Sequence, residues 1–257
     1  MTVVCFLIAL TASIIGAITG VGGGVIMKPV LDAVTDYSVS TIGLISGSTV
    51  LVMAVVTIIR RSKETKMDFK IAGGVSIGAV TGGILGKSLF DMVKAQAGEN
   101  TVGAVQSLAL MLLTLLTLIV VLNLKRIRTY RVKSPIAHVC IGFALGIISS
   151  FLGIGGGPIN IMALLYFFSM DNKEAAGYSL CIIALSQSAA LIMTLVGGLP
   201  PFSPLTLALS CVGGVAGGII GSKLVAGFSK TQAAQFFACV LGLIVVICAY
   251  NFYTAVA

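Results

Sequence analysis

Two glycine runs have the residue type and spacing that most clearly predict a binding function. Gly22, Gly23 and Gly24 interrupt an apolar stretch at 3–35, and Gly155, Gly156 and Gly157 interrupt a second one at 136–170. Glycine inside a helix costs about 1 kcal/mol relative to alanine, so three in a row should end the helix within the apolar stretch. A second helix should then begin directly after each run.

The start of such a helix could bind an anion. Its first N–H groups have no partner within the helix, and its dipole places partial positive charge there. Pro158 follows the second run, at a position where a helix tolerates the missing N–H. We expect the two helix starts to face each other near the membrane midplane, with a small anion bound between them.

Neutral hydrogen-bonding side chains lie in the predicted membrane segments near these runs. Hydroxyl and amide groups suit a desolvated oxyanion because they donate hydrogen bonds without a fixed charge. The candidate substrate-binding side chains are Ser46, Ser48, Thr49, Asn160, Ser179, Ser186 and Gln187. Lys28, four residues past Gly24, either extends to the membrane interface or supplies positive charge to the substrate.

The acidic residues argue against several other functions. None of the eight Asp and Glu residues lies in the middle of a predicted span, which disfavours cation transport, proton relays and an intramembrane hydrolase. We therefore expect no enzyme activity, no metal and no cofactor. The run Thr81–Ser88 resembles the end of a P-loop but lacks its first glycine. His138, at the entrance of a span, is predicted to lie on the surface.

The composition is that of an all-α polytopic membrane protein. Hydrophobic residues make up 58% of the chain and charged residues 9%, whereas soluble domains are about a quarter charged. A helix needs about 20 apolar residues to cross a bilayer. Such stretches occur at 40–59, 70–90, 103–124, 177–196, 204–226 and 233–253. The net charge of +8 lies in short loops, so we expect a lipid bilayer as partner and no nucleic acid.

The chain contains an internal repeat. The first glycine run recurs at a displacement of 133 positions, and Gly78-x3-Gly82-x3-Gly86 recurs as Gly213-x3-Gly217-x3-Gly221 at a displacement of 135. A small residue at every fourth position predicts close helix packing. We divide the chain into a first transmembrane repeat at 1–124, a basic cytoplasmic linker at 125–135 and a second transmembrane repeat at 136–257.

The two repeats can be parallel or inverted. If each glycine-broken segment is re-entrant, each repeat has three transmembrane helices besides it, and the copies are inverted. That arrangement places 13 of the 16 Lys and Arg residues on the cytoplasmic side, against 10 for parallel copies. The positive-inside rule favours the inverted arrangement.

With these features, the sequence resembles the sulfite exporter TauE/SafE family over essentially its whole length. The resemblance rests on the two glycine runs with Pro29 and Pro158, the basic central loop and the glycine-rich third helix. It implies a secondary transporter, most simply an exporter, of small sulfur-containing oxyanions such as sulfite or sulfoacetate, in a bacterial-type inner (plasma) membrane. Lys28 departs from the apolar residues usual there. A thiosulfate importer, a non-transporting membrane scaffold and self-association as a homo-oligomer all stay open.

Overall fold

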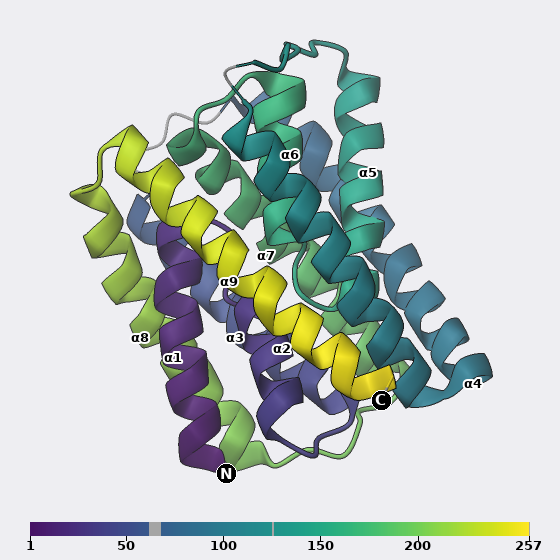
Figure 1. The fold of residues 1–257 in the computed structure, drawn as a ribbon. Helices are drawn as coiled ribbons and strands as arrows, with labels where there is room; N and C mark the ends of the chain where they lie inside the picture. Colours follow the sequence, from purple (N-terminus) through teal and green to yellow (C-terminus); the bar gives the residue numbers. More distant parts are fainter. Residues whose placement is uncertain (62–67, 125, 257) are drawn as a thin grey trace.

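Helices make up all the regular secondary structure in the part of the chain that the computed structural model describes, residues 1–61, 68–124 and 126–256. Figure 1 shows them as one bundle. In chain order they are α1 (Thr2–Thr19), α2 (Gly24–Val34), α3 (Val39–Arg61), α4 (Phe69–Leu122), α5 (Pro135–Leu152), α6 (Gly157–Phe168), α7 (Asn172–Gly197), α8 (Pro204–Ala226) and α9 (Lys230–Val256). The prediction of an all-helical protein is confirmed.

The long helix α4 consists of two helices joined at Gly98. The backbone of Gly98 has φ 81° and ψ 167°, which is not helical, so the chain changes direction there. The first part, 69–97, contains the predicted span 70–90, and the second, 99–122, contains all but the last two residues of the predicted span 103–124. The other four predicted spans form α3, α7, α8 and α9.

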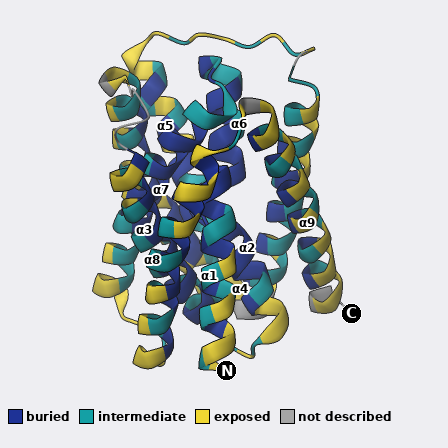
Figure 2. Cartoon of the chain, turned by 90° about the vertical axis from the view of Figure 1, so that its left-hand side faces the viewer, coloured by how far each residue is buried: buried dark blue, intermediate teal, exposed yellow. Residues whose placement is uncertain are grey.

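Seven of the described helices are long and apolar enough to cross a membrane, and this protein is a multi-pass membrane protein. They are Thr2–Thr19, Val39–Arg61, Thr101–Leu122, Pro135–Leu152, Asn172–Gly197, Pro204–Ala226 and Thr231–Thr254. Outer helix faces carry exposed large apolar residues, such as Leu112 and Leu116 on α4 and Val246 and Tyr250 on α9. Exposed residues are yellow in Figure 2. The helix at 69–97 forms as predicted but is not one of the seven, since its glycines and Lys87 lower its hydropathy.

The two rows of glycines at every fourth position, which we call the glycine stripes (Gly78, Gly82 and Gly86; Gly213, Gly217 and Gly221), pack helices closely, as predicted. A Cβ atom on Gly82 of α4 would lie 2.1 Å from the Phe143 carbonyl oxygen of α5, and one on Gly217 of α8 would lie 2.8 Å from the Leu10 carbonyl oxygen of α1. The flanking glycines of each stripe make the same kind of contact one turn away. These are Gly78 with Val139, Gly86 with Ile147, Gly213 with Phe6, and Gly221 with Ile14.

Both glycine runs break the helix as predicted. α1 ends at Gly20, whose φ is 76°, and the chain then turns back along α1, so that a Cβ on Gly16 would lie 2.3 Å from the Gly23 nitrogen. α5 ends at Gly153, and Gly155 and Gly156 also have positive φ before α6 begins. We call α1, α2 and their loop the first hairpin, and α5, α6 and their loop the second hairpin.

The two hairpins end at opposite ends of the bundle. In the first, the Pro29 carbonyl oxygen accepts a 2.7 Å hydrogen bond from Asn251 Nδ2 near the C-terminus, and Figure 1 shows both chain termini at this end. In the second, the Tyr166 carbonyl oxygen accepts a 2.8 Å hydrogen bond from the Tyr130 nitrogen of the basic linker. The linker and the C-terminus lie at opposite ends in Figure 1.

The prediction of a surface position for His138 is wrong. His138 is only 3% exposed, its Nε2 lies 3.1 Å from the Val132 carbonyl oxygen, and its ring packs on Phe168. Val132 of the linker and Phe168 of α6 lie against the ring and bury it.

Candidate functional site

The tips of the two hairpins meet in the interior. A Cβ on Gly157 would lie 1.6 Å from the Val21 carbonyl oxygen, and one on Gly24 would lie 2.8 Å from the Ile154 carbonyl oxygen. The two helix starts therefore come together as predicted, but each abuts a carbonyl group of the opposite hairpin. The glycine triplets form a tight backbone contact in this structure.

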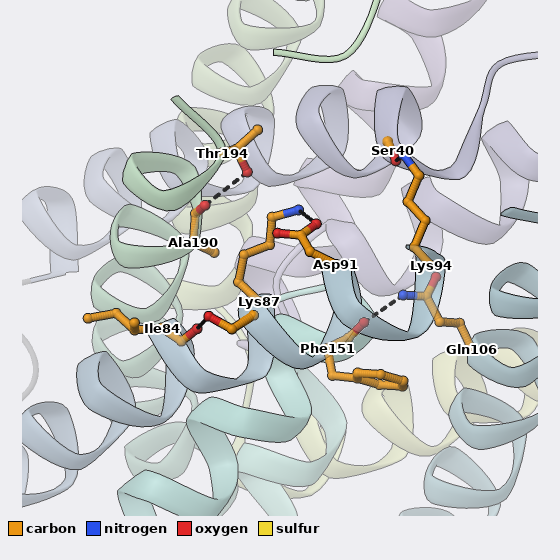
Figure 3. A network of polar contacts seen from close by, with 10 residues as sticks. Ser40, Ile84, Lys87, Asp91, Lys94, Gln106, Phe151, Ala190 and Thr194 are labelled. Atoms are coloured by element: carbon orange, nitrogen blue, oxygen red, sulfur yellow. Dashed lines mark hydrogen bonds and ion pairs between the residues drawn. The ribbon is translucent and has the colours of Figure 1, made fainter. Parts of the chain in front are cut away.

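A cavity of ≈ 730 Å³ lies beside this contact and reaches the second hairpin at Gly153. Its wall is formed by the start of α3, the 87–95 segment of α4, the C-terminal half of α7 and the loop that follows α7. Figure 3 shows part of it, with Lys87, Asp91 and Lys94 of α4 beside Ala190 and Thr194 of α7.

Three lysines and one acid line this cavity, which gives it an excess of positive charge. Lys87 pairs with Asp91 at 2.8 Å and lies over the Phe90 ring. Lys94 Nζ donates a 2.7 Å hydrogen bond to Ser40 Oγ (Figure 3). An anion entering here meets more cations than carboxylates.

Lys28 is the innermost of the three lysines. Its side chain is 9% exposed, so it does not extend to the membrane interface, and its ammonium lies inside the protein. Nζ donates to Gln106 Oε1 at 2.5 Å and to the Leu152 carbonyl oxygen at 2.6 Å. An ammonium has three N–H donors, so one remains for a further acceptor in the cavity.

Two further donors in the cavity wall have no partner among the described residues. Gln187 is 3% exposed and Ser150 is 4% exposed, and neither Gln187 Nε2 nor Ser150 Oγ has a hydrogen-bond partner. An unpaired buried polar group costs about 1–3 kcal/mol, which a bound acceptor would offset. Gln187 Nε2 lies close to Gly155, 3.4 Å from where a Cβ would be, so it reaches the tip of the second hairpin.

Two other candidates support the second hairpin. Asn160 Nδ2 donates to the Gly155 carbonyl oxygen at 3.2 Å, while its Oδ1 has no described partner. Ser46 Oγ lies 3.5 Å from the Gly153 carbonyl oxygen, at the limit of a hydrogen bond. Both side chains therefore contact the loop that borders the cavity.

Neither these two residues nor the remaining candidate side chains are among the cavity-lining residues. Ser186 Oγ donates to the Ile183 carbonyl oxygen of its own helix, and Thr49 packs against Gly214 of α8. Ser179 is fully buried, and Ser48 is half-buried on α3.

Sequence reasoning missed Lys87, Lys94, Gln106 and Ser150 as site residues. The signal for the two lysines was their spacing of seven positions, which places them on one helix face with Asp91 between them. Gln106 and Ser150 carry no such signal, because α4 and α5 bring them together only in the folded chain.

The helical bundle with its positively charged cavity fits a polytopic membrane transporter. The chain belongs to the sulfite exporter TauE/SafE family, whose model matches residues 5–248. It is 24% identical over 215 residues to the Bacillus subtilis (strain 168) protein named "Probable membrane transporter protein YunE", covering 76% of this chain and 79% of that protein. No solved structure matches the chain significantly.

Proposed function

We propose that this protein is a secondary transporter that exports small sulfur-containing oxyanions, such as sulfite, sulfoacetate and related organosulfonates, across a bacterial plasma membrane. The observation that carries the proposal is a set of three donor residues around one cavity. They are Lys28, with its buried ammonium, and Gln187 and Ser150, whose buried Nε2 and Oγ have no partner among the described residues. Together they match the several acceptor oxygens of a sulfite or sulfonate group.

The charge of the cavity favours an anion over a cation or a neutral solute. The Lys28 ammonium donates to neutral oxygens of Gln106 and Leu152. Asp91, the acid in the wall, is already paired with Lys87. Asp32, one turn further along α2, already attracts the Lys28 ammonium, and an anion bound in the cavity adds to this attraction.

The packing supports a chain of two inverted repeats, 1–124 and 136–257, each with one re-entrant hairpin and three transmembrane helices. The hairpins meet at their tips and end at opposite ends of the bundle, beside Asn251 and Tyr130. The glycine-rich helix of each repeat packs on the first helix of the other: the 69–97 part of α4 packs on α5, and α8 packs on α1. Inverted repeats around a central site are a common basis of alternating access.

A membrane potential is a sufficient driving force for export. Moving one negative charge out of a cell with a negative interior gains about 2.3 kcal/mol per 100 mV. Coupling to a proton relay is therefore unnecessary.

Counterflow in proteoliposomes tests the proposal. Vesicles loaded with unlabelled sulfite should accumulate labelled sulfite when they contain the protein, and protein-free vesicles should not. Labelled sulfoacetate, thiosulfate and sulfate, tested in the same way, rank the substrates. Counterflow of thiosulfate alone would favour the importer alternative, and no counterflow of any of the four would favour a non-transporting scaffold.

A further inference from the structure

Gln106 ties the two halves of the chain together next to the cavity. Its side chain is 4% exposed and uses both ends of its amide. Oε1 accepts the hydrogen bond from Lys28 Nζ. Nε2 donates to the Phe151 carbonyl oxygen at 2.5 Å, and Figure 3 shows this second hydrogen bond. Gln106 thus links α2 and α4 of the first half to α5 of the second.

These contacts complete the hydrogen bonding at the end of α5. The last four carbonyl groups of a helix have no partners within it. The Ser149 and Ser150 carbonyl oxygens accept from the backbone nitrogens of Gly153 and Ile154. The remaining two, those of Phe151 and Leu152, accept from Gln106 and Lys28. A cation at this position also interacts favourably with the helix dipole.

The arrangement is specific to one of the two hairpins. At the repeat displacement of 133, Lys28 corresponds to Ile161, and at the displacement of 135, Gln106 corresponds to Leu241. Both of these residues are apolar and buried. The hairpin fold itself therefore does not require a lysine and a glutamine here, which indicates a function beyond packing.

We propose that Gln106 is the positioning residue for Lys28, and that the transported anion displaces the Leu152 carbonyl oxygen from the Lys28 ammonium. Lys28 and Gln106 both line the cavity, so an anion can first contact the third N–H of the ammonium. An ionised acceptor forms stronger hydrogen bonds than a neutral carbonyl, so the anion then competes with Leu152 for a second N–H. Once Lys28 turns to the anion, the Leu152 carbonyl loses its partner and the end of α5 is released. Anion binding then loosens the contact between the halves of the chain, which is the contact that alternating access must change. This inference depends on the proposed anion transport.

The test measures labelled-sulfite binding and amide hydrogen exchange in purified protein in nanodiscs. In the wild type, saturating sulfite should raise exchange at Gly153 and Ile154 severalfold, because their hydrogen bonds lie at the released end of α5. In Gln106→Leu, exchange there should be high without sulfite, sulfite should add little, and the Kd should rise about tenfold. Gln106→Asn should restore part of the affinity, and Gln235→Leu, on an exposed α9 position, is the matched control.

The outcomes separate the two proposals. If wild-type protein binds sulfite with unchanged exchange at 153–154, displacement is wrong and anion transport stands. If Gln106→Leu binds sulfite with wild-type affinity and has wild-type exchange, the positioning role is wrong. If the wild type binds no sulfite, sulfoacetate or thiosulfate, the proposed function fails and the displacement of Leu152 fails with it.

Discussion

The Lys28 ammonium of α2 lies 2.6 Å from the Leu152 carbonyl oxygen of α5. A cation from one half of the chain therefore caps the C-terminal end of a helix from the other half. The same ammonium lines the cavity that carries the excess positive charge. The residue that holds the hairpins together is therefore also the residue that an entering anion meets at the inner end of the cavity.

Replacing Gln187 with methionine should separate stability from function. The change removes a buried donor without a partner and keeps the side-chain volume, so the free energy of unfolding should rise by about 1 kcal/mol. Sulfite affinity should fall about tenfold, because the anion loses a hydrogen bond. Thermal unfolding in detergent and labelled-sulfite binding measure the two effects. Wild-type affinity in this variant would remove Gln187 from the site.

Gln187→Glu should abolish transport in protein that still folds. A carboxylate at this position would repel the substrate anion, and its charge would be costly to bury. Counterflow at equal reconstituted protein level gives the result, with Gln235→Glu on the exposed face of α9 as the matched control. Wild-type counterflow by Gln187→Glu would place the transport path elsewhere.

A side chain in either glycine triplet should stop transport even when the other triplet is unchanged. Gly23→Leu and Gly156→Leu should each stop transport, since a Cβ on Gly156 would lie 1.8 Å from Ser149 Oγ and one on Gly23 would lie 3.1 Å from the Ala12 backbone. Gly242→Ala, with open space around it, is the control. Flux per folded molecule, measured with thermal stability, distinguishes a transport role from packing alone. Normal flux per folded molecule in both leucine variants would mean that the triplets only pack.

Both chain termini should lie outside the cell, because the basic linker is at the opposite end of the bundle from both of them. A single cysteine added after Ala257, in a variant whose six native cysteines are replaced by serine or alanine, should react with a membrane-impermeant maleimide in intact cells. A cysteine placed at Arg128 in the linker is the control and should react only after lysis. Labelling of the C-terminal cysteine only after lysis would contradict the orientation.

Local sequence patterns predicted the helices, the breaks and the glycine packing. Gly82 and Gly217 could be assigned to packing because spacing of four places small residues on one helix face, and the structure puts a backbone carbonyl against each. The break at Gly22–Gly24 followed from the low helix propensity of glycine. These features depend on residues near each other in the sequence.

The cavity depends on distant residues, so the sequence could not define it. Lys28 could be at the interface or inside, and its two acceptors, Gln106 Oε1 and the Leu152 carbonyl oxygen, lie 78 and 124 positions away and keep it inside. Thr49 and Gln187 were both candidates as neutral hydrogen-bonding residues in predicted spans. The face of α7 that carries Gln187 lines the cavity, whereas the face of α3 that carries Thr49 packs against α8. No local pattern encodes this difference.

The most direct test of the anion site is counterflow of labelled sulfite by Lys28→Met, compared with Lys223→Met on an exposed position of α8. Both variants lose one positive charge, but only Lys28 lines the cavity. The site proposed here predicts that Lys28→Met loses at least about 90% of wild-type counterflow per folded molecule, since a buried charged hydrogen bond is worth about 1.5–3 kcal/mol. Lys223→Met should keep wild-type counterflow. Equal, undiminished counterflow by the two variants would contradict the assignment of the anion to Lys28.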